Sequence, residues 1–183
     1  MRVEKSITQK KDLIILKNKQ EYIDFEPSFR WLTESVACML AFGFGTGLSK
    51  IMPGTVGTLV AFIPAFFIAG MGLPQSYLLT LSLVLFLIGI FVCDVVQRKL
   101  GCADYSGIVI DEIVAMMLIL SIVPVSWQNW LLAFIFFRIF DIWKPWPIRS
   151  IDKSISGGLG VMLDDILAVF YVILVFVVFQ LFN

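Results

Sequence analysis

The stretch YLLTLSLVLFLIGIFVCDV, from Tyr77 to Val95, decides the class of fold, because Asp94 is its first charged residue. A helix of about 20 mostly apolar residues can cross the hydrocarbon core of a bilayer. The segment before it, Gly72–Ser76, carries no charge, whereas Arg98 and Lys99 follow it. The stretch is therefore predicted to be a membrane-spanning helix whose carboxyl end lies at a charged surface.

Four more apolar runs have a similar composition, and the chain as a whole is strongly apolar. Of its 183 residues 59% are hydrophobic and 15% are charged, with a mean hydropathy of +0.92, whereas soluble domains are about 45–50% apolar. The four runs are Thr55–Met71, Ile108–Val123, Trp130–Trp143 and Val161–Phe182. Ser35–Gly47 is apolar but too short to span, so we expect an interfacial or re-entrant helix there. The predicted fold is all-α, an integral membrane helical bundle of about five spans plus that extra helix.

The distribution of basic residues predicts the orientation of this bundle. Residues 1–30 form a polar tail, and residues 31–183 form the membrane-embedded domain. All 14 lysines and arginines fall in the tail or in alternate connections of the five-span arrangement. Cytoplasmic loops carry the excess of basic residues, so we expect a multi-pass membrane protein with its N-terminus inside and its C-terminus outside.

The chain contains no histidine, and this absence excludes several kinds of chemistry. A Ser-His-Asp triad, a phosphohistidine intermediate and an imidazole base are all impossible. The formal net charge is zero, so nothing indicates a nucleic-acid partner, and no feature identifies a protein partner. Catalysis, if present, must rest on carboxylates, lysines, arginines, backbone amides and a metal ion.

Acidic residues gather at the predicted cytoplasmic ends of the spans. Asp94 and Asp141 close the second and fourth runs, and the pair Asp164–Asp165 opens the fifth. Charged residues in membrane segments are rare and usually functional, and carboxylate oxygens are the ligands that Mg²⁺ prefers. A single acid at a helix start is also explained by the helix dipole, but two acidic pairs are not. The predicted Mg²⁺ ligands are Asp104, Asp111, Glu112, Asp141, Asp164 and Asp165.

Basic side chains and glycines near these acids indicate an anion site. Arg138, Asp141 and Lys144 recur every three residues, so they lie along one side of a helix end that the following prolines terminate. They form either a surface ion network or a grip for phosphate. Glycines before a helix let backbone amides approach an anion. The predicted phosphate-binding residues are Arg138, Lys144, Arg149, Gly45, Thr46, Thr55, Gly157 and Gly158.

Together, these segments resemble the phosphatidylglycerophosphatase A family of bacterial membrane phosphatases over roughly residues 40–170. Four blocks carry the resemblance: GTGLS at 45–49 with PGTVG at 53–57, DYSGIVIDE at 104–112, RIFDIWKPWPI at 138–148 and GGLGVMLDD at 157–165. The sequence departs from the family pattern at Tyr105, where many members have histidine, and at Ala115 and Val169, where glycine is common. The first departure implies that the imidazole is dispensable or replaced, and the other two concern helix packing.

The resemblance implies Mg²⁺-dependent hydrolysis of phosphatidylglycerophosphate to phosphatidylglycerol and phosphate, on the cytoplasmic side of the bacterial inner membrane. The expected catalytic residues are Asp111, Glu112, Asp164, Asp165 and Lys144, with either metal-bound water or an aspartate as nucleophile. Two rivals stand beside this interpretation. Another lipid-headgroup phosphotransferase would need an acidic spacing that the sequence lacks. An ion or anion transporter would place polar groups through the bilayer midplane rather than at one face.

Overall fold

The computed structural model describes residues 26–102, 105–149 and 155–181, and over these ranges the chain is all-α, as predicted. Eight α-helices and one 3₁₀ helix are present in the part of the chain described. In chain order they are α2 (Phe29–Thr33), α3 (Val36–Ala41), η1 (Gly43–Leu48), α4 (Pro53–Val60), α5 (Phe62–Gly70), α6 (Ser76–Leu100), α7 (Ile110–Ile122), α8 (Trp127–Trp143) and α10 (Gly158–Leu181). Each of the five predicted apolar runs is helical.

Three segments are long and apolar enough to cross a membrane. They are Pro53–Gly70, which combines α4 and α5, Ser76–Leu100 and Gly158–Phe179. The other two predicted spans are shorter helices, since α7 has 13 residues and α8 has 17, against the roughly 20 that a straight crossing needs. The chain is thus a helical membrane protein with three candidate spans, and the count of five stays a prediction.

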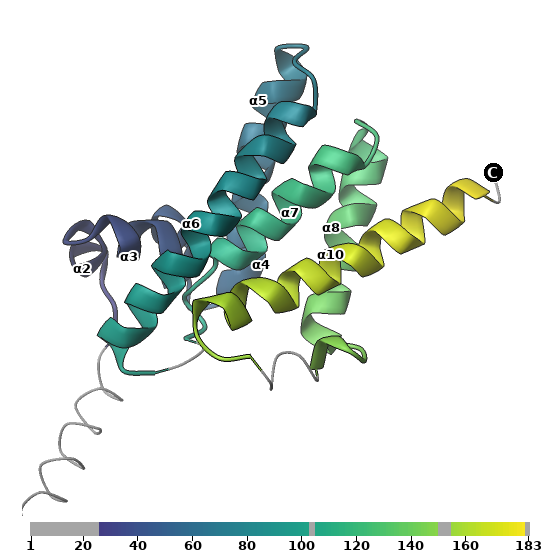
Figure 1. Cartoon of the computed structure of the whole chain (residues 1–183). Coiled ribbons are helices and arrows are strands. Elements are labelled where there is room, and N and C mark those ends of the chain that lie inside the picture. The colour runs from purple at the N-terminus through teal and green to yellow at the C-terminus, as the bar shows by residue number, and fades with distance from the viewer. Residues whose placement is uncertain (1–25, 103–104, 150–154, 182–183) are drawn as a thin grey trace, which may run out of the picture.

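Helix α7 lies at the centre of the bundle, between α6, α10, α8 and the α4–α5 segment (Figure 1). Most of its 13 residues are buried. Ala115 on α7 and Val169 on α10 are both buried in the same apolar core, so both departures from the family pattern fall at packed positions. The outward faces of α6 and α10 carry many large exposed apolar side chains, such as Leu87, Phe91 and Phe170. Such surfaces suit contact with lipid.

The predicted re-entrant or interfacial segment Ser35–Gly47 folds into two short elements, α3 beside α6 (Figure 1) and η1 beside α4. Its glycines allow a close backbone approach to the connection before α7. A Cβ on Gly47 would lie 2.0 Å from the carbonyl oxygen of Gly107, and the Val109 amide donates to the Ala41 carbonyl at 2.8 Å. The glycine-rich segment therefore fixes the chain that leads into α7.

The start of α10 differs from the prediction. The helix begins at Gly158, before Val161, so Asp164 and Asp165 lie in its second and third turns rather than opening it. Asp94 likewise does not close the second span, because α6 continues to Leu100. Gly158 and Gly160 were expected to precede the helix, but both lie within its first turn and do not prevent it from forming.

Asp94 instead links α6 to the first turn of α10. The Gly158 amide donates a hydrogen bond to Asp94 Oδ1 at 2.5 Å, as an N-capping carboxylate would, and such caps stabilise a helix by about 0.5–2 kcal/mol. The helices approach closely at two glycines. A Cβ on Gly158 would lie 1.9 Å from the Ile90 carbonyl oxygen, and one on Gly89 would lie 2.7 Å from Met162 Sδ. Small residues at helix contacts are typical of membrane bundles.

Candidate metal and phosphate site

One end of the bundle contains a cavity of about 340 Å³ that is lined by five separate segments. These are the start of α4, the connection before α7, the first turn of α7, the end of α8 and the second and third turns of α10. The lining residues are Met52, Pro53, Gly54, Tyr105, Ser106, Ile108, Asp111, Glu112, Arg138, Asp141, Ile142, Lys144, Asp164 and Asp165. Five of the six predicted metal-binding acids therefore share one cavity, and the sixth, Asp104, lies outside the described residues.

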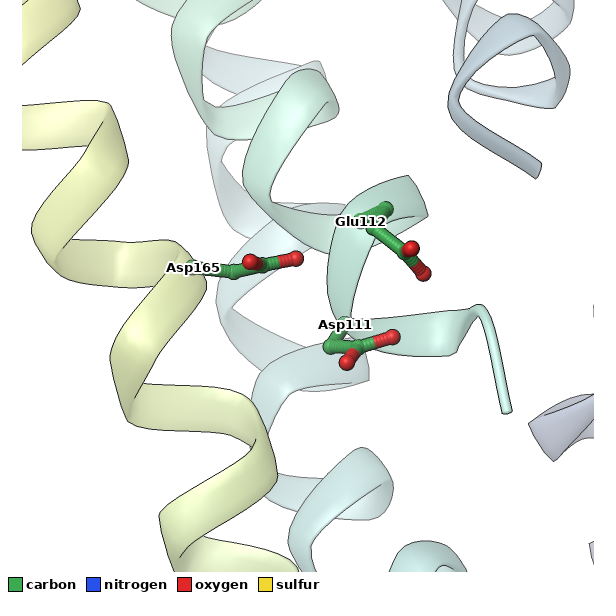
Figure 2. A group of neighbouring side chains, drawn as sticks. All are labelled: Asp111, Glu112 and Asp165. Carbon is green, nitrogen blue, oxygen red and sulfur yellow. The ribbon is translucent and has the colours of Figure 1, made fainter. Parts of the chain in front are cut away.

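Three of these acids form a compact cluster. Asp165 points from α10 towards the first turn of α7, which carries Asp111 and Glu112 (Figure 2). One carboxylate oxygen from each residue lies within 4.8 Å of the others. Asp111 Oδ1, Glu112 Oε2 and Asp165 Oδ2 are buried without a hydrogen-bond partner. Because buried polar atoms are normally satisfied and like charges this close repel, the arrangement fits a bound cation.

Arg138 on α8 neutralises part of this acidic group. Its Nη1 lies 2.7 Å from Asp141 Oδ2 and 3.7 Å from Glu112 Oε1, with both side chains of the shorter pair only 14% exposed. The same nitrogen donates to Thr58 Oγ1 at 3.5 Å. Gly54 makes room for the Glu112 carboxylate beside Arg138, since a Cβ at Gly54 would lie 2.0 Å from Glu112 Oε1.

Lys144 supplies the second positive charge. It follows α8 as the C-cap in a left-handed conformation with φ 45°, and Pro145 prevents the helix from continuing. Lys144 Nζ lies 2.6 Å from Asp164 Oδ2. Arg138, Asp141 and Lys144 all line the cavity, although Lys144 lies just beyond the helix, and each cation is beside an acid.

The other predicted phosphate-binding residues do not line the cavity. Gly45 and Thr46 lie in η1, where the Thr46 hydroxyl donates to the Gly43 carbonyl at 2.9 Å. Thr55 follows the cavity-lining start of α4, and its buried hydroxyl has no partner. The Gly158 amide donates to Asp94 on α6, and a Cβ on Gly157 would lie 2.8 Å from Asp94 Oδ1. Arg149 is exposed.

Two wall segments contribute lining residues that were not among the predicted site residues. The first turn of α4 contributes Pro53 and Gly54, whose amide end is a favourable place for an anion. The connection before α7 contributes Tyr105 and Ser106. Partial burial, and then the charges of Cys102 and Glu26, raise the pKa of the Tyr105 hydroxyl, so it is neutral at physiological pH. The PGTVG block was the sequence signal for α4, whereas no spacing indicated Ser106.

Fold and site together define a helical membrane protein with a cluster of carboxylates that could bind a metal ion, in a cavity that Arg138 and Lys144 also line. Comparison with known proteins narrows this class. The phosphatidylglycerophosphatase A family model matches residues 39–180. The phosphatidylglycerophosphatase A of Escherichia coli is 43% identical over 71% of this chain and 75% of its own length. The phosphatidylglycerophosphatase A of Haemophilus influenzae is 39% identical over 75% of this chain and 84% of its own length.

This chain belongs to the phosphatidylglycerophosphatase A family, and it is therefore a phosphomonoesterase of lipid metabolism. A further relative, from Bacteroides thetaiotaomicron, is provisionally named a phosphatidylinositol-3-phosphatase and is 36% identical over 73% of this chain and 86% of its own length. No solved structure matches the chain.

Proposed function

We propose that the protein hydrolyses phosphatidylglycerophosphate to phosphatidylglycerol and inorganic phosphate, with Mg²⁺ as cofactor, at the cytoplasmic face of the membrane. The observation that carries the proposal is the cluster of Asp111, Glu112 and Asp165, whose buried oxygens lack partners, in one cavity with Arg138 and Lys144. Membership of the phosphatidylglycerophosphatase A family supports the choice of substrate.

The donor set favours Mg²⁺ over softer metals. Every candidate ligand is a carboxylate oxygen, and oxygen-only sites suit Mg²⁺, Ca²⁺ or Mn²⁺ rather than Zn²⁺ or Cu²⁺. Asp111, Glu112 and Asp165 would hold the ion. When bound, Mg²⁺ neutralises charge that develops on the phosphate oxygens.

The remaining side chains have separable roles in this proposal. Lys144 binds the terminal phosphate, because its ammonium group lies at the cavity wall and a lysine acts as a mobile point charge. The first turn of α4 presents amide groups that have no partner within a helix, and these favour the same anion. Arg138 holds Asp141 and Glu112 in position rather than binding substrate, since its guanidinium already contacts both acids.

Phosphate release from phosphatidylglycerophosphate by the purified protein in detergent tests the proposed activity. We expect release that stops when EDTA removes divalent cations and returns when Mg²⁺ is added. Phosphatidylinositol 3-phosphate, named by the Bacteroides relative, serves as the competing substrate. Release that persists in EDTA would contradict the metal assignment, and faster hydrolysis of the inositol lipid would contradict the substrate.

Lys144→Ala should raise KM for the phosphorylated lipid and lower kcat. A hydrogen bond to a charged group contributes about 1.5–3 kcal/mol, so kcat/KM should fall roughly tenfold to a hundredfold. Lys144→Arg should restore only part of the activity, because a planar fork and a point charge make different contacts. Unchanged kinetics in Lys144→Ala would limit this residue to its ion pair with Asp164.

The proposed membrane face leads to a prediction about topology. With five spans and all basic residues inside, a reporter fused after Asn183 should lie in the periplasm. Reporters after Arg30 and at Ser154 should lie in the cytoplasm, and one inserted at Gln75 should be periplasmic. Protease or alkaline phosphatase assays on cells would read these positions. A cytoplasmic C-terminus would overturn the five-span arrangement.

A further inference from the structure

Two of the side chains that line the polar cavity are large, apolar and mostly exposed. Met52, at the start of α4, is 56% exposed, and Ile142, in the last turn of α8, is 65% exposed. The apolar lining residue Ile108, in contrast, is 5% exposed. Exposed apolar surface on a membrane protein is a surface for lipid. On the side between α4 and α8, the cavity therefore borders surroundings that suit acyl chains.

Aromatic residues place this border at the depth of lipid headgroups. Trp143 comes directly after Ile142 and Trp146 a few residues later, and both are exposed. Tryptophan is enriched where headgroups meet acyl chains, because its ring is apolar and its N–H is polar. Arg138, Lys144 and the acid cluster lie beside this border, inside the cavity. A phosphate-bearing lipid that approached from the bilayer would bring its headgroup to these charges without leaving the membrane.

Backbone conformation marks the same two segments. Met52 has φ 50° and Lys144 has φ 45°, and both residues line the cavity. Left-handed backbone is unusual for residues other than glycine, above all for bulky ones, and it concentrates at functional sites. At Met52 it precedes α4, and at Lys144 it ends α8. Both sides of the border thus have a residue in left-handed backbone.

We propose that the lipid substrate enters the cavity sideways from the bilayer, between Met52 and Ile142. These two side chains contact the acyl chains of the lipid while its terminal phosphate lies near Lys144. The inference rests on the proposed function for the identity of the substrate. It adds a docking surface for a diacyl lipid and makes Met52 and Ile142 determinants of chain-length selectivity.

Kinetics with two substrates that share a headgroup test this surface. One is phosphatidylglycerophosphate with long acyl chains, and the other is its short-chain, water-soluble form. Ile142→Ser and Met52→Asn remove the apolar contact, and asparagine tolerates left-handed backbone. We expect each variant to lower the ratio of kcat/KM for the long-chain over the short-chain substrate about tenfold, in line with the loss of one partly buried apolar side chain. Ile139→Ser, also exposed on α8 but outside the cavity lining, should leave the ratio unchanged.

Photolabelling provides a readout that does not require turnover. The probe is a long-chain diacyl phosphomonoester lipid with a diazirine in one acyl chain, applied in EDTA. Labelling should concentrate on peptides that contain Met52 and Ile142, and excess unlabelled phosphomonoester lipid should reduce it more than phosphatidylglycerol does.

The outcomes separate this inference from the proposed function. Competed labelling at Met52 and Ile142 without hydrolysis of phosphatidylglycerophosphate would keep the entry surface and reject the substrate. Hydrolysis with an unchanged selectivity ratio in both variants, or the same fall in Ile139→Ser, would overturn the entry surface and keep the function. Labelling spread evenly over the apolar exterior would also overturn it.

Discussion

Asp165→Asn is expected to insert and fold normally yet lose most of the phosphatase activity. The change keeps the size of the side chain and one carbonyl oxygen, but it removes the charge from a buried member of the acid cluster. Neutralising a charge inside a membrane helix does not oppose insertion. Losing a contact that stabilises developing charge typically costs about 10²–10³ in kcat. Phosphate release at increasing Mg²⁺ would measure the loss, and the remaining activity should need more Mg²⁺.

A binding measurement separates loss of the metal from loss of the fold. Mn²⁺, which accepts the same oxygen ligands, can be followed by electron paramagnetic resonance in the purified protein. Asp165→Asn should bind it more weakly, whereas Glu34→Gln, an exposed carboxylate outside the cavity lining, should bind it as the original chain does. Full activity with unaltered Mg²⁺ dependence in Asp165→Asn would exclude this residue from the metal site.

Arg138→Met should destabilise the protein more than Asp165→Asn or Lys144→Ala does. The variant leaves the carboxylates of Asp141 and Glu112 next to one another without their shared cation. Removing one partner of a buried ion pair typically costs about 3–5 kcal/mol. Reversible unfolding in mixed detergent micelles would measure the change in the free energy of unfolding.

A matched control and a double variant make this expectation specific. Arg98→Met removes an arginine that is 74% exposed and 4.0 Å from Asp94, so it should cost under about 1 kcal/mol. Adding Asp141→Asn to Arg138→Met should recover part of the stability, because it removes one unbalanced charge. Equal effects of the two arginine variants would show that Arg138 does not neutralise the acid group.

The sequence allowed the helices to be predicted more securely than the partners of the acids. Long apolar runs require a backbone with internal hydrogen bonds in lipid, so the five helices follow from composition alone. The central helix α7 is one of these five, and its two acids are visible at the start of the apolar run Ile108–Val123. Its 13 residues are fewer than the roughly 20 that a straight crossing needs, and composition alone did not predict that length.

The two glycine-rich blocks show why the site itself was only partly predictable. Both precede or begin a helix, and both were expected to bind an anion. In the fold, the α4 block with Gly54 faces the cavity, while Gly158 receives the carboxylate of Asp94 from α6. Which helix end faces which acid depends on how the helices pack, and no local pattern specifies that packing. For the same reason, Asp164 and Asp165 were placed together, although one lies beside Lys144 and the other joins the α7 acids.

The position of Asp164 and Asp165 on α10 also has a consequence for how the enzyme is made. Every other segment that lines the cavity precedes α10 in the chain and is therefore synthesised first. Until α10 docks, the nascent protein has Asp111, Glu112 and both cations but lacks the third carboxylate of the cluster. Carboxylates within an apolar helix oppose its transfer into lipid, and Lys144 offers one of them an oppositely charged partner. The cluster of three carboxylates is therefore complete only after α10 has inserted and packed against α7, so an incompletely inserted chain lacks it.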